Sequence, residues 1–309
     1  MSEARAGAKS APELVLSGLT IVDEKGAPRI RLDTAESTPR VRLFDDKGAT
    51  RAALGLAEGG PALSLYDDKG ATRAGLLLAE GEPVLVFCGD KEALRAALGL
   101  VKGGPRLSLF DEAGARRAAL GLVKGEPGLE LYDDKGARRA ALAVDKDGAV
   151  LSLFDQKGAW RTSLALLKGE PGLVLRDDQG VARASLALGK DGPALELYDE
   201  KGALRAALGV VKDGTALGLY DDQRVARAGL VLGKDGPALE LYDEKGATRA
   251  ALALAEGEPG LVLLDEKEAP LAVFGAAKLV AAPTGATEQT GPSSVTLFDR
   301  DGKVLWKAP

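Results

Sequence analysis

Apolar residues recur at every second position along most of the chain. In and just before Ser64–Pro83, SLYDDKGATRAGLLLAEGEP, Leu63 and Leu65 precede an Asp–Gly turn, and Leu76 and Leu78 follow it. Two leucines at i and i+2 lie about 200° apart on a helix but share one face of a strand. The pattern therefore predicts two β-strands joined by a turn.

A strand–helix repeat like that of leucine-rich proteins is the alternative, because stretches such as RAALGL contain good helix formers. Two observations oppose it. Glycine lies inside the same stretch, where each would cost a helix about 1 kcal/mol, at Gly55, Gly99, Gly121 and Gly209. The Asn of leucine-rich repeats is absent from the pattern. We therefore expect strands in both halves of the phrase.

The phrase repeats every 22 residues. The turn glycine marks nine copies, at Gly26, Gly48, Gly70, Gly114, Gly136, Gly158, Gly180, Gly202 and Gly246. Glu92, Arg224 and Glu268 replace it in the other three, and an Arg follows three residues later in every copy but the last, which has Leu271. The twelve copies contain no insertion or deletion, so either the duplication is recent or both turns contact neighbours. Drift, such as Cys88 in a position that is usually aromatic, favours the second explanation.

Each repeat contains two turn signals. Asp67 and Gly70 stand at the first and last positions of a type I turn. The other turn ends in Gly and Pro, as EGEP or KDGP, where Pro83 or Pro193 opens a strand without needing its N–H.

One repeat has too few large apolar side chains to offset the entropy of ordering its 22 residues, so neighbours must stabilise it. Two all-β arrangements satisfy this requirement. The expected one is an elongated β-solenoid, in which residue i stacks on i+22 and the Leu rows point into a thin two-sheet core. The alternative is an antiparallel β-hairpin meander that other chains complete in a fibre.

The repeat pattern divides the chain into four parts. Residues 1–18 are expected to form an N-terminal leader or cap, and residues 19–275 are the twelve β-repeats. Residues 276–292 read as a connector rich in Thr, Gly and Pro. Residues 293–309 resume a strand–turn–strand pattern out of register, which is typical of a cap.

The second strand of each repeat has small residues on the face opposite its leucines. The positions are occupied by residues such as Ala53, Gly75, Ala97, Ala119 and Ser163. Two interpretations follow, a smooth solvated surface and the close approach of another sheet or chain.

Composition excludes several kinds of chemistry. The 41 basic and 46 acidic residues give a net charge of −5, which provides no basic surface for nucleic acid. The chain has no His and one Cys, so an intrachain disulfide, a zinc site built on Cys or His, and Ser–His or Cys–His catalysis are excluded. No apolar run approaches the roughly 18 residues of a membrane helix. No secretory signal is visible, which leaves a cytoplasmic location and export by another route both open.

The acidic turns do not match a known calcium loop, and their Lys opposes a cation. We therefore expect no metal and no cofactor. Two rows of side chains remain as candidate partner contacts, for a glycan or another repetitive ligand. They are an aromatic row and an Arg row, represented by Tyr66, Tyr132, Tyr198, Tyr220 and Tyr242 and by Arg73, Arg139 and Arg205. Packing of the rings and pairing of Arg with nearby carboxylates are the competing explanations.

The stretch LYDDKGATRAGL and its copies resemble uncharacterised bacterial repeats of the form LxLYDxxGxxRAxLxxxxxGxP. The YDxxG core is also similar to YD-repeat proteins, and this resemblance implies hairpins that build shells. It covers most of the chain, but the Arg/Lys–Tyr pairs expected of YD repeats are absent. It assigns no functional residue.

These observations predict a non-enzymatic structural repeat protein that self-assembles as a fibre, spacer or scaffold. The alternative is a binding module that presents the aromatic and Arg rows to a glycan. A third class is an enzyme that uses carboxylates in the divergent copies, near Asp90 or Glu268.

Overall fold

The computed structural model consists of β-strands joined by short turns, and among the described residues the one helical element is a short 3₁₀ helix, η2 (Asp90–Glu92). It describes residues 15–34, 38–57, 60–101, 104–123, 125–212, 214–234, 236–255, 257–276, 278–280, 287–291, 294–299 and 301–308. The chain forms two units, residues 1–137 and residues 138–309. The all-β class with two strands per repeat is confirmed.

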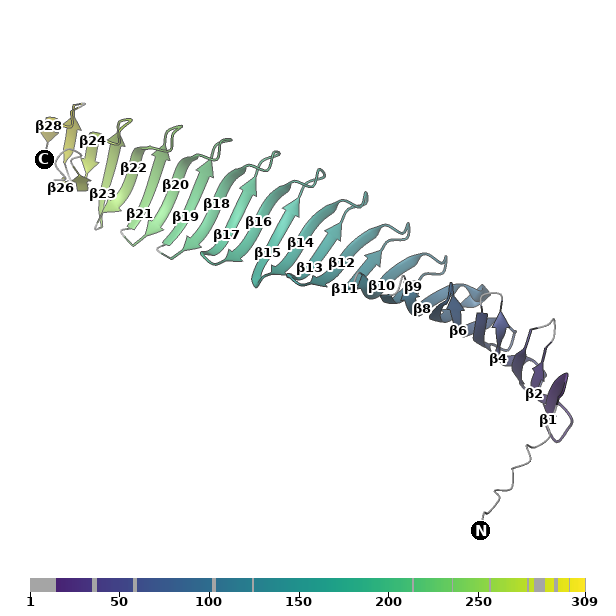
Figure 1. Ribbon diagram of the computed structural model, residues 1–309. Helices are drawn as coiled ribbons and strands as arrows, with labels where there is room; N and C mark the ends of the chain where they lie inside the picture. The colour runs from purple at the N-terminus through teal and green to yellow at the C-terminus, as the bar shows by residue number, and fades with distance from the viewer. Residues whose placement is uncertain are drawn as a thin grey trace, which may run out of the picture. The chain divides into compact units, whose positions relative to one another are not determined.

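In the first unit each strand pairs antiparallel with the next strand along the chain. Figure 1 shows these strands as successive hairpins. They are β1 (Gly18–Val22), β2 (Pro28–Asp33), β3 (Arg40–Phe44), β4 (Thr50–Ala57), β5 (Gly60–Tyr66), β6 (Thr72–Ala79), β7 (Glu82–Cys88), β8 (Leu94–Val101), β9 (Gly104–Phe110), β10 (Arg116–Val123) and β11 (Glu126–Tyr132).

The second unit continues the same antiparallel pattern from β12 to β24, after which β24 pairs with β27 and β27 with β28. Two short strands, β25 and β26, pair separately. The bounds are β12 (Arg138–Asp145), β13 (Gly148–Phe154), β14 (Trp160–Leu167), β15 (Glu170–Arg176), β16 (Ala182–Gly189), β17 (Gly192–Tyr198), β18 (Leu204–Val211), β19 (Gly214–Tyr220), β20 (Ala226–Gly233), β21 (Gly236–Tyr242), β22 (Thr248–Ala255), β23 (Glu258–Leu264), β24 (Pro270–Gly275), β25 (Lys278–Val280), β26 (Thr287–Gln289), β27 (Val295–Phe298) and β28 (Val304–Ala308).

The antiparallel pairing decides between the two predicted arrangements. Leu76 of β6 lies opposite Leu63 of β5 on one side and Leu85 of β7 on the other. A parallel solenoid would instead place Leu63 beside its equivalent 22 residues later. The expected stacking of i on i+22 is therefore corrected, and the repeats form the hairpin meander that was the alternative. The reason is that both turns of each repeat reverse the chain within the plane of the sheet.

The Asp–Gly turn is a three-residue hairpin loop with a bulge. Asp177 N donates to Val181 O at 3.0 Å, and Gly180 N donates to Asp177 O at 3.2 Å. This is a type I turn followed by a left-handed residue, and Gly180 supplies that residue with φ +82°. The register then shifts by one residue, so that the Arg after the turn is the bulged residue of its strand.

The second turn follows one of two patterns. In the EGEP form Glu80 and Gly81 both have positive φ, 53° and 85°, which is the type I′ turn that matches the twist of a hairpin. In the KDG form the two loop residues precede a glycine with positive φ, such as Gly148 at 142°. Both forms have a fixed length, which agrees with the absence of insertions in the sequence.

One face of the sheet, here called the Leu face, presents the residues equivalent to Leu63, Leu65, Ala74, Leu76 and Leu78 in each repeat. From Leu19 to Phe274 these positions contain only Leu, Ile, Val, Phe, Ala and Thr, and no charged residue. The leucines are not buried, because Leu120 is 53% and Leu164 is 55% exposed. The two-sheet core expected for the Leu rows is therefore absent from the described residues.

The opposite face, here called the small-residue face, presents the residues equivalent to Ala62, Ser64, Tyr66, Gly75 and Leu77. It contains several buried residues, among them Ala119, Ser108 and Ser163. Larger side chains of the same face lie close to the small positions. A Cβ on Gly218 would lie 2.7 Å from the Tyr220 hydroxyl, and one on Gly121 would lie 3.1 Å from Arg106 Cβ. The chain's own side chains therefore occupy part of the space over these small residues.

A small core exists at the C-terminal end of the second unit. Val273 of β24 lies opposite Thr296 of β27, and both side chains are buried. Val273 packs with Phe298 and with Val262 of β23. Gly275 O accepts a hydrogen bond of 2.7 Å from Thr290 Oγ1, which holds the segment before β27 against the end of β24.

The predicted domain limits are only partly within the described residues. Residues 1–14, and residues 277, 281–286 and 292 of the predicted connector 276–292, lie outside them. The predicted cap, residues 293–309, includes the β27–β28 hairpin. Its turn has the same Asp–Gly hydrogen bonds as the repeats, from Asp299 N to Lys303 O and from Gly302 N to Asp299 O.

At the turn position with positive φ, replacing glycine and introducing glycine should have opposite effects on the free energy of unfolding. Gly158→Ala, at φ +81°, should lower the free energy of unfolding by about 1 kcal/mol, because a Cβ is disfavoured there. Arg224→Gly, at φ +65°, should raise it by a similar amount. Gly189→Ala is the matched control, because Gly189 has no positive φ and open space around it. Urea unfolding followed by circular dichroism measures all three, and a loss for Gly189→Ala as large as for Gly158→Ala would contradict the explanation.

Candidate functional site

The turn Asp accepts the backbone N–H groups of its own loop. Asp177 Oδ1 accepts from Gln179 N and from Val181 N, both at 3.0 Å. An Asp side chain is short enough to form this arrangement, which fixes the loop that follows it. The same pair of hydrogen bonds recurs in other repeats, for example at Asp67 and Asp243. The near-invariance of this Asp is therefore explained by local structure.

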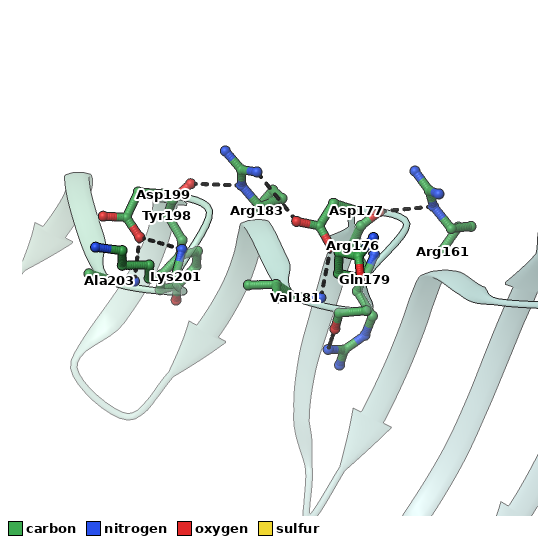
Figure 2. A network of polar contacts seen from close by, with 11 residues as sticks. Arg161, Arg176, Asp177, Gln179, Val181, Arg183, Tyr198, Asp199, Lys201 and Ala203 are labelled. Carbon is green, nitrogen blue, oxygen red and sulfur yellow. Dashed lines mark hydrogen bonds and ion pairs between the residues drawn. The ribbon is translucent and has the colours of Figure 1, made fainter.

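The Arg after the turn joins that Asp to the next hairpin. Arg183 Nη1 lies 3.3 Å from Asp177 Oδ2, while Arg183 Nε donates to the carbonyl of Tyr198 at 3.1 Å (Figure 2). Arg161 makes the equivalent bond to the carbonyl of Arg176 at 3.0 Å. Because this carbonyl belongs to the next strand, at the residue just before the next Asp turn, each of these two Arg residues ties consecutive Asp turns together. We call the series the Asp–Arg ladder, and it runs along the edge of the sheet where the Asp turns lie.

The predicted Arg candidates belong to this ladder. Arg73 pairs with Asp67 at 2.7 Å and with Asp90 at 3.2 Å, and Arg205 lies 3.8 Å from Asp199. Arg139 is at the equivalent position of β12. The pairs are partly exposed, and such pairs contribute little stability individually. Their effect is to fix the relative position of neighbouring turns.

Hydrogen bonding lowers the pKa of the turn carboxyls. The N–H of Ala71 is the largest cause at Asp67, and the N–H of Lys245 is the largest at Asp243. The paired Arg lowers the pKa of both carboxyls further. The folded state therefore prefers these turns ionised.

Two of the three residues that replace the turn glycine reach back to the preceding repeat. Glu92 accepts from Thr72 N at 2.8 Å, and Glu268 accepts from Thr248 N at 3.1 Å. The N–H of Thr72 lowers the pKa of Glu92. The carboxylates on which the enzyme alternative depends, Asp90 and Glu268, thus have contacts within the turns.

The candidate tyrosines lie on the small-residue face and extend back along their own strands. Tyr132 Oη donates to Glu130 at 2.7 Å. Tyr198 donates to Glu196, with Ser185 beside it, and Tyr242 donates to Glu240. Tyr220 lies close to Gly218, and Tyr66 lines a hollow described below.

Burial is the main cause that raises the pKa of Tyr132, Tyr198 and Tyr242, and the hydrogen-bonded Glu adds to it. The pKa of Tyr242 reaches about 12. The rings therefore serve as neutral donors to carboxylates at ordinary pH. The sequence analysis missed this Tyr–Glu pairing, although Glu occurs two residues before Tyr in three of the copies.

Two hollows lie over the first strands of the first unit. One, of about 580 Å³, is on the small-residue face and is lined by Tyr66, Arg40 and Arg42 among others. The other, of about 750 Å³, is lined by Leu19, Leu32 and further apolar residues, together with Asp33 and Arg40. Within the described part of the chain, no group of three or more acidic or Cys side chains is placed to hold a metal ion. No helix among the described residues is long and apolar enough to cross a membrane.

No family model matches the sequence, and no curated protein matches it. The comparison with solved structures gives weak matches. The Photorhabdus luminescens Tc holotoxin pore is 9% identical over 94% of this chain, with a TM-score of 0.17, and the match spans 18% of that chain. An Agrocybe aegerita lectin specific for non-reducing terminal N-acetylglucosamine is 14% identical, with a TM-score of 0.17, over 76% of this chain and 73% of the lectin.

A porin-like protein from Bacteroides uniformis is 9% identical over 84% of this chain and 92% of its own length, with a TM-score of 0.13. Similarities at this level carry no conclusion about this chain. The described strands themselves fit the repeating β-strand pattern implied by the sequence resemblance, while the specific repeat motif has no family match.

The Asp turns predict a loss of stability in acid. Their folded pKa values lie below the unfolded value of 3.8, so their contribution is complete above about pH 4 and is lost as the pH falls through the folded values. Asn keeps the loop hydrogen bonds without titrating. The triple variant Asp155→Asn, Asp177→Asn, Asp199→Asn should therefore show a smaller change in urea midpoint between pH 5 and pH 2. An unchanged slope would contradict the assignment.

Proposed function

We propose that this chain is a non-enzymatic structural repeat protein that self-assembles by burying its Leu face against the Leu face of a second copy. The observation that carries the proposal is the uncharged, half-exposed Leu face. Monomeric proteins rarely expose apolar patches larger than a few hundred Å². A face of this kind is typical of a surface that is covered in the working state of the protein.

The area is sufficient for a stable interface. The Leu-face side chains of the first unit are exposed by 36% or more in strand after strand, from Leu19 to Leu131. Taken together they present on the order of 1,500 Å², against the roughly 800 Å² per partner of a standard interface. Burying this face desolvates no charged side chain, so the apolar gain is not offset by an ion-desolvation penalty.

The same face of a second copy is the partner that fits. It has the same row spacing along every strand and the same uncharged surface, so rows of Leu can interdigitate along the strands of each unit. Two sheets that pack in this way lie about 10 Å apart and form a β-sandwich. The hollow bounded by Leu54, Leu63, Leu76 and Leu78 is an apolar groove of the kind that receives such rows.

The small-residue face and the turn edge support this proposal over the glycan-binding alternative. The Arg rows are engaged with Asp and with backbone carbonyls, as at Arg183 and Arg73. Tyr132, Tyr198 and Tyr242 are engaged with Glu. A ligand would have to compete with these contacts, whereas the Leu face has none to lose.

Adjacent residues on opposite faces of one strand give the test. Leu142 and Leu186 lie on the Leu face at 42% and 50% exposure, and Ala143 and Ala187 are their exposed neighbours on the other face. The variant Leu142→Lys, Leu186→Lys should lower the mass of the assembly by removing face-to-face pairing, because burying four ammonium groups per pair of copies is unfavourable. Light scattering coupled to size exclusion measures the mass.

The matched control is Ala143→Lys, Ala187→Lys, which adds the same charge to the same two strands and should leave the mass of the assembly unchanged. A wild-type protein that stays a single chain at all concentrations would contradict the proposal, and this includes the case in which the other unit of the same chain covers the Leu face. Equal loss of assembly in both variants would also contradict it.

A further inference from the structure

The strands at the two ends of the described meander each have one unpaired edge. Among the described residues, β1 pairs with β2 and β28 pairs with β27. Each therefore has a row of backbone N–H and C=O groups that no other described strand takes. Such an edge is a template for pairing with another chain unless charge, Pro or a covering segment blocks it. The strand β1, GLTIV, contains neither a charged residue nor Pro.

The two edges are of complementary kinds. The strand β1 precedes an Asp turn, which begins at Asp23, and β28 follows one, which begins at Asp299. Inside the meander, a strand that follows an Asp turn always pairs next with a strand that precedes one, as β6 does with β7. The outer edge of β28 can therefore pair with the outer edge of β1 of another copy in the way that two consecutive strands of the meander pair.

The register of that pairing follows from the repeats. In β6 and β7, the opposed residues are Ala74 and Phe87, Gly75 and Val86, and Leu76 and Leu85. Counted from their turns, Trp306, Lys307 and Ala308 take the places of the three β6 residues. Ile21, Thr20 and Leu19 likewise take the places of the three β7 residues.

The geometry points to head-to-tail assembly, in which β28 of one copy adds to β1 of the next with Trp306 opposite Ile21, Lys307 opposite Thr20 and Ala308 opposite Leu19. In this register Trp306 and Ile21 continue the Leu face, where they are 52% and 47% exposed before assembly. Lys307 and Thr20 continue the small-residue face. No strand has to change its structure.

The pairing is heterologous, so each addition leaves the same two edges free and the array grows. The inference rests on the proposed function as a self-assembling element, and it names a second interface. Face-to-face packing of Leu faces gives thickness, and edge pairing gives length. The substitutions that test the two interfaces are at different residues, so each interface can be tested when the other is removed.

Disulfide trapping tests the register. Cys88 is the chain's one cysteine, so Cys88→Ser gives a background without thiols. In that background, Thr20→Cys with Lys307→Cys places two thiols on opposed residues of one face, within reach of a disulfide. Oxidation should give a ladder of dimers, trimers and longer species on a non-reducing gel.

Ile21→Cys with Lys307→Cys is the matched control, because its thiols lie on opposite faces of the paired strands and should not form the ladder. Equal ladders in both variants, no ladder in either, or a disulfide confined to single chains would overturn the inference. Repeating the experiment with Leu142→Lys and Leu186→Lys present separates the two interfaces. A ladder that persists there supports edge pairing even when face-to-face packing fails.

A charge exchange gives a second test that needs no cysteine. Thr20→Lys places two lysines opposite each other and should shorten the arrays seen by analytical ultracentrifugation and negative-stain microscopy. Adding Lys307→Glu to that variant should restore their length. Arrays unaffected by Thr20→Lys, or not restored by the second substitution, would overturn the assigned register.

Discussion

A single layer of antiparallel strands satisfies its backbone hydrogen bonds but leaves both of its faces in water. The rest of this structure depends on how far the residues of each face are shielded from water by the chain's own side chains. On the small-residue face, Tyr, Arg and Glu side chains lie over Gly, Ala and Ser, so that Ala119 and Ser163 are buried without any second layer. On the Leu face nothing comparable is available, because the rows contain no long polar side chain that covers their neighbours. The sheet therefore has one face with buried small residues and one face with half-exposed leucines.

The Asp–Arg ladder explains how so many strands keep one register. The turn Asp fixes its loop through two backbone N–H groups. Four Arg residues link their turns to the carbonyl that ends the next strand, namely Arg161, Arg183, Arg227 and Arg249. A slip of one residue would exchange the two faces and break both contacts. The Leu face stays uniform because the turns are fixed in series.

The sequence was sufficient to predict the strands, the Asp–Gly turn and the pairing of Arg with Asp, since each depends on residues fewer than seven positions apart. It favoured the wrong stacking, because Leu at i and i+22 suits a solenoid and a meander equally. The type I′ signal at Glu80–Gly81, a turn typical of hairpins, was present and would have decided the matter. Burial of the Leu rows was expected because folded chains usually bury such residues. Whether they are covered depends on a second layer, about which a local pattern carries no information.

The central claim is that the Leu face is covered by the Leu face of a second copy. A cryo-electron microscopy reconstruction of the assembled protein tests it most directly. The account predicts two sheets about 10 Å apart with the Leu rows between them and the small-residue faces outward. A single-layer sheet with an open Leu face, or an assembly joined through the small-residue faces, would contradict it.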